Sequence, residues 1–357
     1  MINANVNIFE GFIKVKNKRN KINDIKLPWV EKYRPVNSSE ILLDPFIKTK
    51  IDKILETKSI PNLIITGEPG TGKTSTIICL AKQIYNEKNY NEYVLELNAS
   101  DDRGLYMINN TIYPFCKKKT DGTNKLIILD ECDSITPKAQ NLLANIISEF
   151  RKNTRFVFIC NDCTQIIESI QSLCMIIKYP RISKKDLYNK IQYICAQEII
   201  EYDDIGIESL LFVSDMDIRQ SINNLECIYY AFGKLSDDNV YKMIDKPKPI
   251  YIEKIINSCL NGNLIEAIET TKELYLKGYY PNDILLTFMK CLLEKDLGIK
   301  EATKLKIHEI ISLSYIRVNG GIDTLLQLCG CIAKIYMFLG PSHEKIVLEK
   351  NIIQQIS

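Results

Sequence analysis

The sequence contains few arginines and no long apolar run. Arginine accounts for only eight of its 46 basic residues, and the others are lysines. A transmembrane helix needs about eighteen consecutive apolar residues, and no such run occurs, so we expect no membrane-spanning segment. Residues 1–26 also lack the apolar stretch of a signal peptide. The net charge of +2 is too small for the whole molecule to attract nucleic acid, so any such contact needs a local basic patch.

The 12 cysteines do not have the spacing of a disulfide framework. Several lie within apolar runs, such as Cys79, Cys195 and Cys329, and we interpret them as buried free thiols in a reducing compartment. A zinc site would need a second cysteine pair or nearby histidines, and Cys160–Cys163 is the only CxxC in the sequence. The two histidines are far from it along the chain, so we expect no zinc site.

The N-terminal segment 1–26 is basic and precedes the first apolar motif. It fits a nuclear import signal or a nucleic-acid-binding arm, and it fits equally well a solvated tail with neither role. Its clustered basic residues are Lys14, Lys16, Lys18, Arg19 and Lys21.

The first half of the chain alternates short β-branched runs with segments of helical length. Examples of the helical segments are Thr74–Ile84 and Pro137–Phe150. This alternation predicts an α/β fold with a parallel sheet covered on both faces, and ligands bind such sheets at the carboxyl ends of the strands. The five predicted strands are Leu63–Thr66, Tyr93–Leu97, Lys125–Leu129, Arg155–Ile159 and Met175–Tyr179.

Beyond Pro180 the pattern becomes helical, and 184–242 shows no convincing strand. The charged, proline-containing stretch Asp245–Pro249 indicates a linker. The helices after it carry too much apolar surface to be lone surface helices, so we expect them to pack on one another or on neighbouring chains. The predicted helices are Leu187–Ile199, Ile207–Ser214, Arg219–Phe232, Tyr251–Leu260, Leu264–Leu276, Pro281–Leu293, Thr303–Arg317 and Asp323–Phe338.

A phosphate-binding loop follows the first predicted strand. Residues Gly67–Thr74 match the pattern GxxxxGK[ST], and a predicted helix follows them. Glycines let backbone N–H groups surround phosphate oxygens, and the helix end adds partial positive charge. Lys73 is placed to reach the β- and γ-phosphates of ATP, and the Thr74 hydroxyl to bind Mg²⁺.

Two carboxylates end the third predicted strand. Asp130 is placed to hold Mg²⁺ through water, and Glu131 to orient and activate the attacking water. The alternative is simple solvation at the end of a strand, but the phosphate-binding loop makes the functional interpretation the stronger one.

The sequence gives weaker evidence for a functional role of two further polar residues. Asn161 follows the fourth predicted strand and could hold the attacking water beside the γ-phosphate, or it could be an ordinary turn former. Arg219 begins a predicted helix and could reach the γ-phosphate, or it could be an exposed surface arginine.

The motifs together resemble those of the small subunits of replication factor C, an AAA+ clamp loader of DNA replication. The resemblance covers nearly the whole chain, and the C-terminal motifs look most like one particular small subunit. The motifs that carry it are Leu27–Pro35, Gly67–Thr74, Glu96–Gly104, Asp130–Glu131, Asp217–Asn224, Lys246–Pro249 and Leu326–Gly330.

The resemblance implies an AAA+ core at 27–180 after the tail 1–26, a helical lid at 181–245, and an all-helical collar at 246–357. The collar would join five subunits in a hetero-pentameric ring. In the nucleus, that complex would use ATP and Mg²⁺ to open a sliding clamp and place it on primer–template DNA.

The resemblance also implies roles for single residues. Asn161 and Arg219 would be sensors of the γ-phosphate, and they would act in hydrolysis with Lys73, Asp130 and Glu131. The residues expected beside the adenine are Val30, Tyr33, Arg34 and Pro35. Those expected around the phosphates and the metal are Gly67, Pro69, Gly70, Thr71, Gly72, Lys73, Thr74, Ser75 and Asp130.

The chain also departs from the family. Leu173 stands where the family has an arginine finger for a neighbour's ATP, and such a finger is worth about 10³–10⁵ in rate. Ala144, Asn145 and Asn109 replace basic residues of the DNA-facing helices, which predicts weaker DNA contact. Nearby basic residues could compensate or simply be solvated, and they are Lys117–Lys119, Lys138, Arg151 and Lys152.

Three functions fit these observations. The first is a clamp-loader ATPase subunit that hydrolyses ATP with a neighbour's finger. The second is a structural ring subunit that binds nucleotide and turns it over negligibly, which Leu173 favours. The third is an AAA+ remodeller unrelated to DNA.

Overall fold

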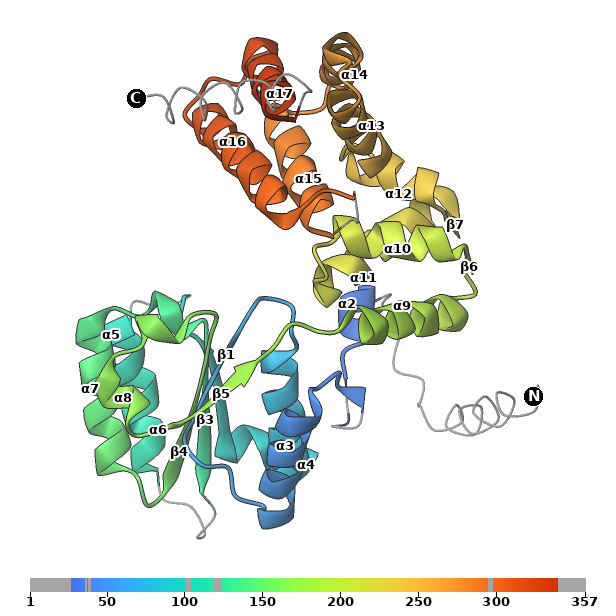
Figure 1. Ribbon diagram of the computed structural model, residues 1–357. Coiled ribbons are helices and arrows are strands. Elements are labelled where there is room, and N and C mark those ends of the chain that lie inside the picture. Colours follow the sequence, from blue (N-terminus) through green and yellow to red (C-terminus); the bar gives the residue numbers. More distant parts are fainter. Residues whose placement is uncertain are drawn as a thin grey trace, which may run out of the picture.

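The computed structural model describes residues 27–339, except 36, 38–39, 101–103, 119–123 and 295–297. It consists of an α/β core, a helical lid and a helical collar (Figure 1). The basic segment 1–26 lies outside the described residues, as do Lys119 and part of the Glu96–Gly104 motif. Within the described ranges, no helix combines the length and apolar character needed to cross a bilayer.

Five strands form one parallel sheet in the order β2-β3-β4-β1-β5. Strand β1 lies between β4 and β5, with Leu63 opposite Val157 on one side and Met175 on the other. This sheet confirms the predicted α/β fold class. The strands are β1 (Leu63–Gly67), β2 (Val94–Asn98), β3 (Lys125–Asp130), β4 (Thr154–Cys160) and β5 (Met175–Tyr179).

Helices bury both faces of the sheet, which explains why its strands are apolar at consecutive positions. On β3, Ile127 and Leu129 face one group of helices, whereas Leu126 and Ile128 face the other. Figure 1 shows α3 and α4 on one side of the sheet and α5 to α8 on the other. The elements are α3 (Pro45–Thr57), α4 (Lys73–Tyr93), α5 (Gly104–Met107), a π-helical turn (Ile108–Ile112), α6 (Tyr113–Lys117), α7 (Pro137–Glu149), α8 (Glu168–Gln171) and two 3₁₀ turns (Cys132–Ser134 and Cys163–Gln165).

The lid is a separate group of helices with its own apolar cluster. Three of these helices begin at a side chain that caps their free N–H groups, namely Ser183, Asp203 and Asp217. The lid helices are α9 (Lys184–Glu198), α10 (Asp204–Val213), α11 (Ile218–Phe232) and α12 (Asp237–Ile244).

A short parallel ladder in the lid corrects our expectation of no strand in 184–242. Strand β6 (Glu201–Tyr202) pairs with β7 (Lys234–Leu235). Strands of two residues are too short to show the alternation by which a strand is recognised in a sequence. The ladder joins the segment before α10 to the segment before α12.

Helix α2 (Trp29–Lys32) packs on the lid, although it precedes the core in sequence. Trp29, the only tryptophan, is 4% exposed, and its ring centroid lies 5.3 Å from that of Tyr229 on α11. Its backbone N–H donates to Glu226 Oε2 at 2.9 Å. The N-terminal motif therefore connects the lid to α3 of the core.

The part of the collar that the structure describes consists of five helices around another apolar cluster, which includes Ile255, Phe288 and Ile311. This mostly helical C-terminal region agrees with the predicted fold. The collar helices are α13 (Pro249–Leu260), α14 (Leu264–Leu276), α15 (Pro281–Glu294), α16 (Glu301–Asn319) and α17 (Leu325–Leu339).

The stretch Asp245–Pro249, which we predicted as a linker, is packed against the lid. Lys246 Nζ donates a hydrogen bond to Val213 O at 3.0 Å, and Lys248 Nζ lies 3.1 Å from Asp237 Oδ2. Residues 245–248 connect α12 to α13, as a linker does, and both lysines find oxygen partners on the lid. The joint between lid and collar is therefore held by specific contacts.

All 12 cysteines are free thiols, as predicted. Cys79 and Cys195 are buried, whereas Cys329 is only half-buried. Burial raises the pKa of the Cys195 thiol to about 12, so this thiol stays protonated and unreactive at neutral pH.

The apolar cluster of the lid predicts that removal of a buried side chain lowers the free energy of lid unfolding, and the fluorescence of Trp29 can report this change. Leu225 is fully buried in this cluster, so Leu225→Ala should lower the free energy of lid unfolding by about 2–5 kcal/mol. Urea unfolding followed by tryptophan fluorescence measures this change. Leu326→Ala, at a side chain that is 81% exposed, is the control and should change it by less than about 0.5 kcal/mol. Equal effects of the two substitutions would contradict the packing described.

A candidate nucleotide site between core and lid

The phosphate-binding loop connects β1 to α4 and depends on its glycines. Gly70 and Gly72 adopt φ values of 74° and 83°, which side-chain-bearing residues rarely adopt. A Cβ on Gly67 would lie 2.6 Å from Tyr179 O, and a Cβ on Gly70 would lie 2.1 Å from Asp217 Oδ1. The loop therefore lies close to the end of β5 and to the first residues of α11. The N-terminus of α4 points its free N–H groups into the same space.

Lys73 is buried within this loop, with 7% of its surface exposed. Its Nζ donates to Gly67 O at 2.7 Å, to Glu68 O at 2.8 Å and to Asn161 Oδ1 at 2.9 Å. Burial lowers the pKa of Lys73, and the charge of Asp130 opposes this shift. The lysine thus links the loop to the end of β4, with its ammonium group held at the mouth of the loop.

Thr74 and Asp130 meet at the carboxyl end of β3. Thr74 Oγ1 donates a hydrogen bond to Asp130 Oδ2 at 2.8 Å. The N–H of Glu131 donates to Asp130 Oδ1 at 2.9 Å, and Glu131 itself has a φ of 55°. This left-handed residue bends the chain away from the strand and leaves the Glu131 side chain exposed. A hydroxyl and a carboxylate are the oxygen ligands that Mg²⁺ prefers.

Asn161 is fixed through its backbone as well as through Lys73. Its N–H donates to Asp133 Oδ2 at 3.2 Å, and its carbonyl accepts from Thr66 Oγ1 at 3.0 Å. The ends of β1, β3 and β4 therefore bring their polar residues to one place, as expected at the carboxyl edge of a parallel sheet.

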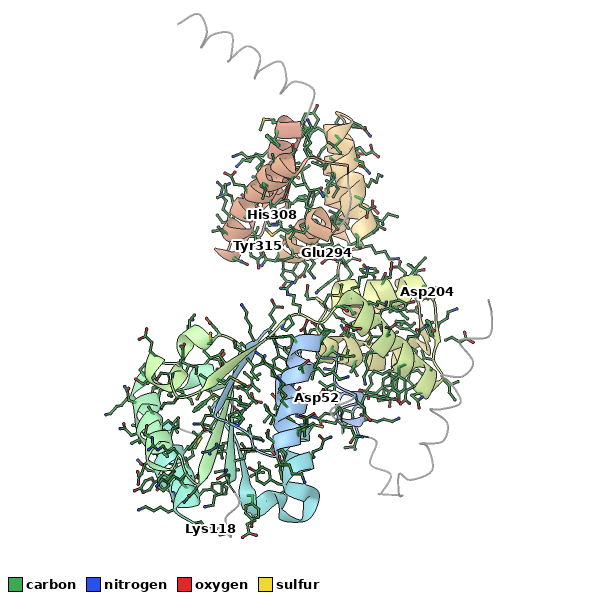
Figure 2. All side chains as sticks on the ribbon, turned by 60° about the horizontal axis from the view of Figure 1, so that its bottom comes forward. Asp52, Lys118, Asp204, Glu294, His308 and Tyr315 are labelled. Atoms are coloured by element: carbon green, nitrogen blue, oxygen red, sulfur yellow. The ribbon has the colours of Figure 1, made fainter. Side chains whose placement is uncertain are left out.

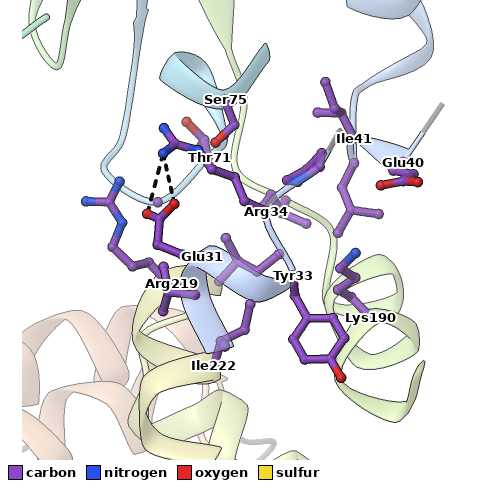
Figure 3. Close-up of a pocket in the computed structure, with 17 residues that line it drawn as sticks. Glu31, Tyr33, Arg34, Glu40, Ile41, Thr71, Ser75, Lys190, Arg219 and Ile222 are labelled. Atoms are coloured by element: carbon purple, nitrogen blue, oxygen red, sulfur yellow. Dashed lines mark hydrogen bonds and ion pairs between the residues drawn. The ribbon is translucent and has the colours of Figure 1, made fainter. Parts of the chain in front are cut away.

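The cleft above these residues has a polar half and an apolar half. The polar half has about 590 Å³ of free space and is lined by the predicted phosphate-loop residues except Gly67, together with Asp130, Glu131 and Asn161. The apolar half has about 700 Å³ and lies between the N-terminal motif, the loop and the lid (Figure 3). The residues that line both halves are Gly70, Thr71, Gly72, Ser75 and Arg219.

All four residues predicted to lie beside a base line the apolar half: Val30, Tyr33, Arg34 and Pro35. The Tyr33 hydroxyl donates to the Glu198 carboxylate on α9. Arg34 is held by Glu31, with a contact of 3.2 Å between NH1 and Oε2. Figure 3 shows this pair beside Thr71, on the same side of the cleft as Arg219.

Several lining residues were not predicted. Five apolar side chains complete the walls of the apolar half: Ile41, Leu42, Ile182, Ile218 and Ile222. Nothing in the local sequence marks them, because the cleft exists only once the lid lies beside the core. Asp217 was also missed as a site residue, although an aspartate just before a predicted helix is the usual signal of an N-cap. Its carboxylate lies against Gly70.

The positions that we interpreted as departures from the family lie elsewhere on the core. Leu173 follows α8 and is 39% exposed, so its side chain can meet a neighbouring chain. Asn109 and Asn145 are exposed on the helices of the same face. Ala144 is buried in the core cluster and is not part of the surface. The nearby basic residues that the structure describes are all exposed: Lys117, Lys118, Lys138, Arg151 and Lys152.

Comparison with known proteins identifies two family domains in the chain. Residues 63–181 match the family described as ATPase family associated with various cellular activities (AAA). Residues 247–334 match the family described as Replication factor C C-terminal domain. The first range covers the sheet and the cleft residues that it carries, and the second covers most of the collar.

Proteins similar over most of the chain carry replication factor C names. Replication factor C subunit 2 of Arabidopsis thaliana is 37% identical over 311 residues, which is 86% of this chain and 92% of that protein. Subunit 4 of Saccharomyces cerevisiae is 37% identical over 87% of this chain and 96% of its own length. Subunit 5 of Homo sapiens is 35% identical over 86% and 91%.

Among solved structures, the RuvB Holliday junction branch migration motor of Thermotoga maritima has a similar fold. The TM-score is 0.50 at 16% identity, over 63% of this chain and 78% of that one. At this identity the similarity concerns the fold alone. The two domain matches and the full-length relatives show the family directly: the chain belongs to the replication factor C small subunits, within the AAA+ proteins.

Proposed function

We propose that the cleft binds Mg²⁺–ATP and that the chain is an ATPase subunit of a clamp loader. The hydrogen bond between Thr74 and Asp130, beside the buried Lys73 ammonium, is the observation that carries this proposal. A hydroxyl, a carboxylate and a cation thus lie close together next to the apolar half, which supports the binding of a triphosphate whose base occupies that half.

Each residue of the cleft has a role that follows from the chemistry of its side chain. The adenine occupies the apolar half, and Lys73 exchanges its carbonyl contacts for the β- and γ-phosphate oxygens. Thr74 and Asp130 would hold the magnesium ion, which would neutralise charge on the phosphates when bound. Glu131 orients the attacking water and takes its proton. Asn161, held by Lys73 and by its own backbone, fixes the position of that water.

Arg219 gives the lid a way to sense the nucleotide. It lies in the first turn of α11 and lines both halves of the cleft. A γ-phosphate attracts its guanidinium group, whereas ADP lacks that phosphate. ATP therefore favours one arrangement of lid and core, and hydrolysis releases it, which is a population shift.

The proposed partners follow from the family and from the surface. The chain acts in the nucleus within a hetero-pentamer of replication factor C subunits, which opens a sliding clamp and loads it on primer–template DNA. The collar exposes many large apolar side chains, which supports contacts with neighbouring subunits. Examples are Ile265, Leu276, Leu293, Leu305 and Leu326.

Glu131→Gln tests the ATPase role. The amide cannot accept the proton of water, so hydrolysis in the reconstituted complex should fall at least about 100-fold, while ATP binding stays within about twofold. Single-turnover hydrolysis and equilibrium binding measure the two effects. Glu149→Gln, at an exposed glutamate on α7, is the matched control and should leave both unchanged. Negligible turnover by the unmodified chain would instead favour the structural ring subunit.

Leu173→Arg tests the proposed contact with a neighbour's ATP. Because arginine can stabilise charge on a transferring phosphoryl group, this substitution should raise hydrolysis at the adjoining site by about tenfold or more. Leu173→Lys, which lacks the planar fork of arginine, is the control and should give a smaller gain. The measurement uses a ring in which only the adjoining site can hydrolyse ATP. If Leu173→Arg left the hydrolysis rate at the adjoining site unchanged, residue 173 would not lie beside that site's ATP.

A further inference from the structure

The turn between α10 and α11 has an unusual backbone. Asp215 and Met216 have φ values of 54° and 59°, so two consecutive residues other than glycine are left-handed. Each such residue costs on the order of 1 kcal/mol or more, and it persists only where the surroundings hold it in place. This turn therefore needs partners that fix it.

Two lysines from outside the lid helices hold it. Lys290, on α15 of the collar, forms an ion pair with Asp215 and also lies 3.5 Å from Phe212 O. Lys246, in the joint between lid and collar, donates to Val213 O at 3.0 Å, and its Nζ lies 3.9 Å from Asp215 Oδ2. Both lysines are half-buried. Their positive charges lie at the C-terminus of α10, where the helix dipole attracts cations.

The position of Lys290 makes it a link between the collar and the lid. Figure 2 shows Glu294, at the end of the same helix, on the side of the collar that faces the lid. The Lys290 ammonium also lies 5.5 Å from the centre of the Phe212 ring. A change in the angle between collar and lid would therefore separate Lys290 from its partners at the turn.

The residues that follow the turn reach the nucleotide cleft. Asp217 Oδ1 accepts from the N–H groups of Arg219, at 2.7 Å, and Gln220, at 3.2 Å. The same carboxylate lies against Gly70 of the phosphate-binding loop. Asp217 and Arg219 follow Asp215 closely in the chain. Met216 and Ile218 are the residues between them. Any displacement of the turn is thus passed to both residues at the cleft.

We infer that Lys290 and Lys246 are positioning residues for Arg219: they fix the Asp215 turn and so set how Arg219 reaches the γ-phosphate. The collar thereby influences the discrimination between ATP and ADP. This inference rests on the proposed function for the role of Arg219. The contacts by which the two lysines fix the Asp215 turn do not depend on the proposed function.

The test uses the full chain with Lys290→Met, which keeps the apolar stem and removes the charge. Its affinity for ATP should fall roughly three- to tenfold, while its affinity for ADP stays within about twofold. Lys290→Arg restores the charge and should recover the affinity. Lys306→Met removes an ion pair with Glu309 elsewhere in the collar, and as the matched control it should have no effect.

Combination with Arg219→Gln separates positioning from general stabilisation. In that background Lys290→Met should cause no further loss of ATP affinity, because the group that it positions is absent. A loss that is fully additive would overturn the inference. An unchanged ratio of ATP to ADP affinity in Lys290→Met alone would also overturn it.

Hydrogen exchange without nucleotide gives an independent readout. The amides of 216–220 should exchange at least about tenfold faster in Lys290→Met than in the unmodified chain, and Lys306→Met should not change them. Unchanged exchange would overturn the hold on the turn. If the unmodified chain bound no ATP while exchange changed as expected, the proposed function would fail and the hold on the turn would stand.

Discussion

The burial of the Lys73 ammonium is the constraint on which the rest of the site depends. A buried cation is stable only when oxygen atoms surround it, because the loss of water around a charge is costly. Two of the acceptors are loop carbonyls and the third is the amide of Asn161, so the loop must lie against the end of β4. The Thr74–Asp130 hydrogen bond then adds the end of β3. The geometry of the polar half therefore follows from the oxygen contacts that the Lys73 ammonium requires.

The polar half could be predicted because each of its parts has a local signal. The loop pattern at Gly67–Thr74 needs a strand before it and a helix after it, and both are evident from periodicity. Asp130 and Glu131 come at the end of a short apolar run of strand length, and the structure confirms this run as the buried strand β3. In a parallel sheet the carboxyl ends of the strands share an edge, so local sequence patterns are enough to predict that these residues meet.

The part of the apolar half that the N-terminal motif forms was predicted from the family resemblance, but its other walls could not be predicted from local patterns. These other walls come from the segment around Ile41, from Ile182 after β5, and from the Ile218–Ile222 turn of α11. These residues resemble any others on an amphipathic element, and they form a cleft only because α2 fixes the lid beside the core through Trp29. The predicted linker at Asp245–Pro249 does connect α12 to α13, but the contacts of its two lysines with the lid could not be predicted, since charges in a sequence do not show their tertiary partners.

The N-terminus of α11 connects the nucleotide cleft with the turn that the collar holds. On one side, Asp217 lies against Gly70 and Arg219 lines the cleft, and on the other side the Asp215 turn contacts the collar. Coupling between two sites is reciprocal: if the collar changes the affinity for ATP by some factor, ATP changes the collar equilibrium by the same factor. A ring assembled through its collars would then respond to the nucleotide by reorienting collar and lid, with no change required within the sheet. The strained turn suits this role, because its left-handed residues stay in place only while their partners do.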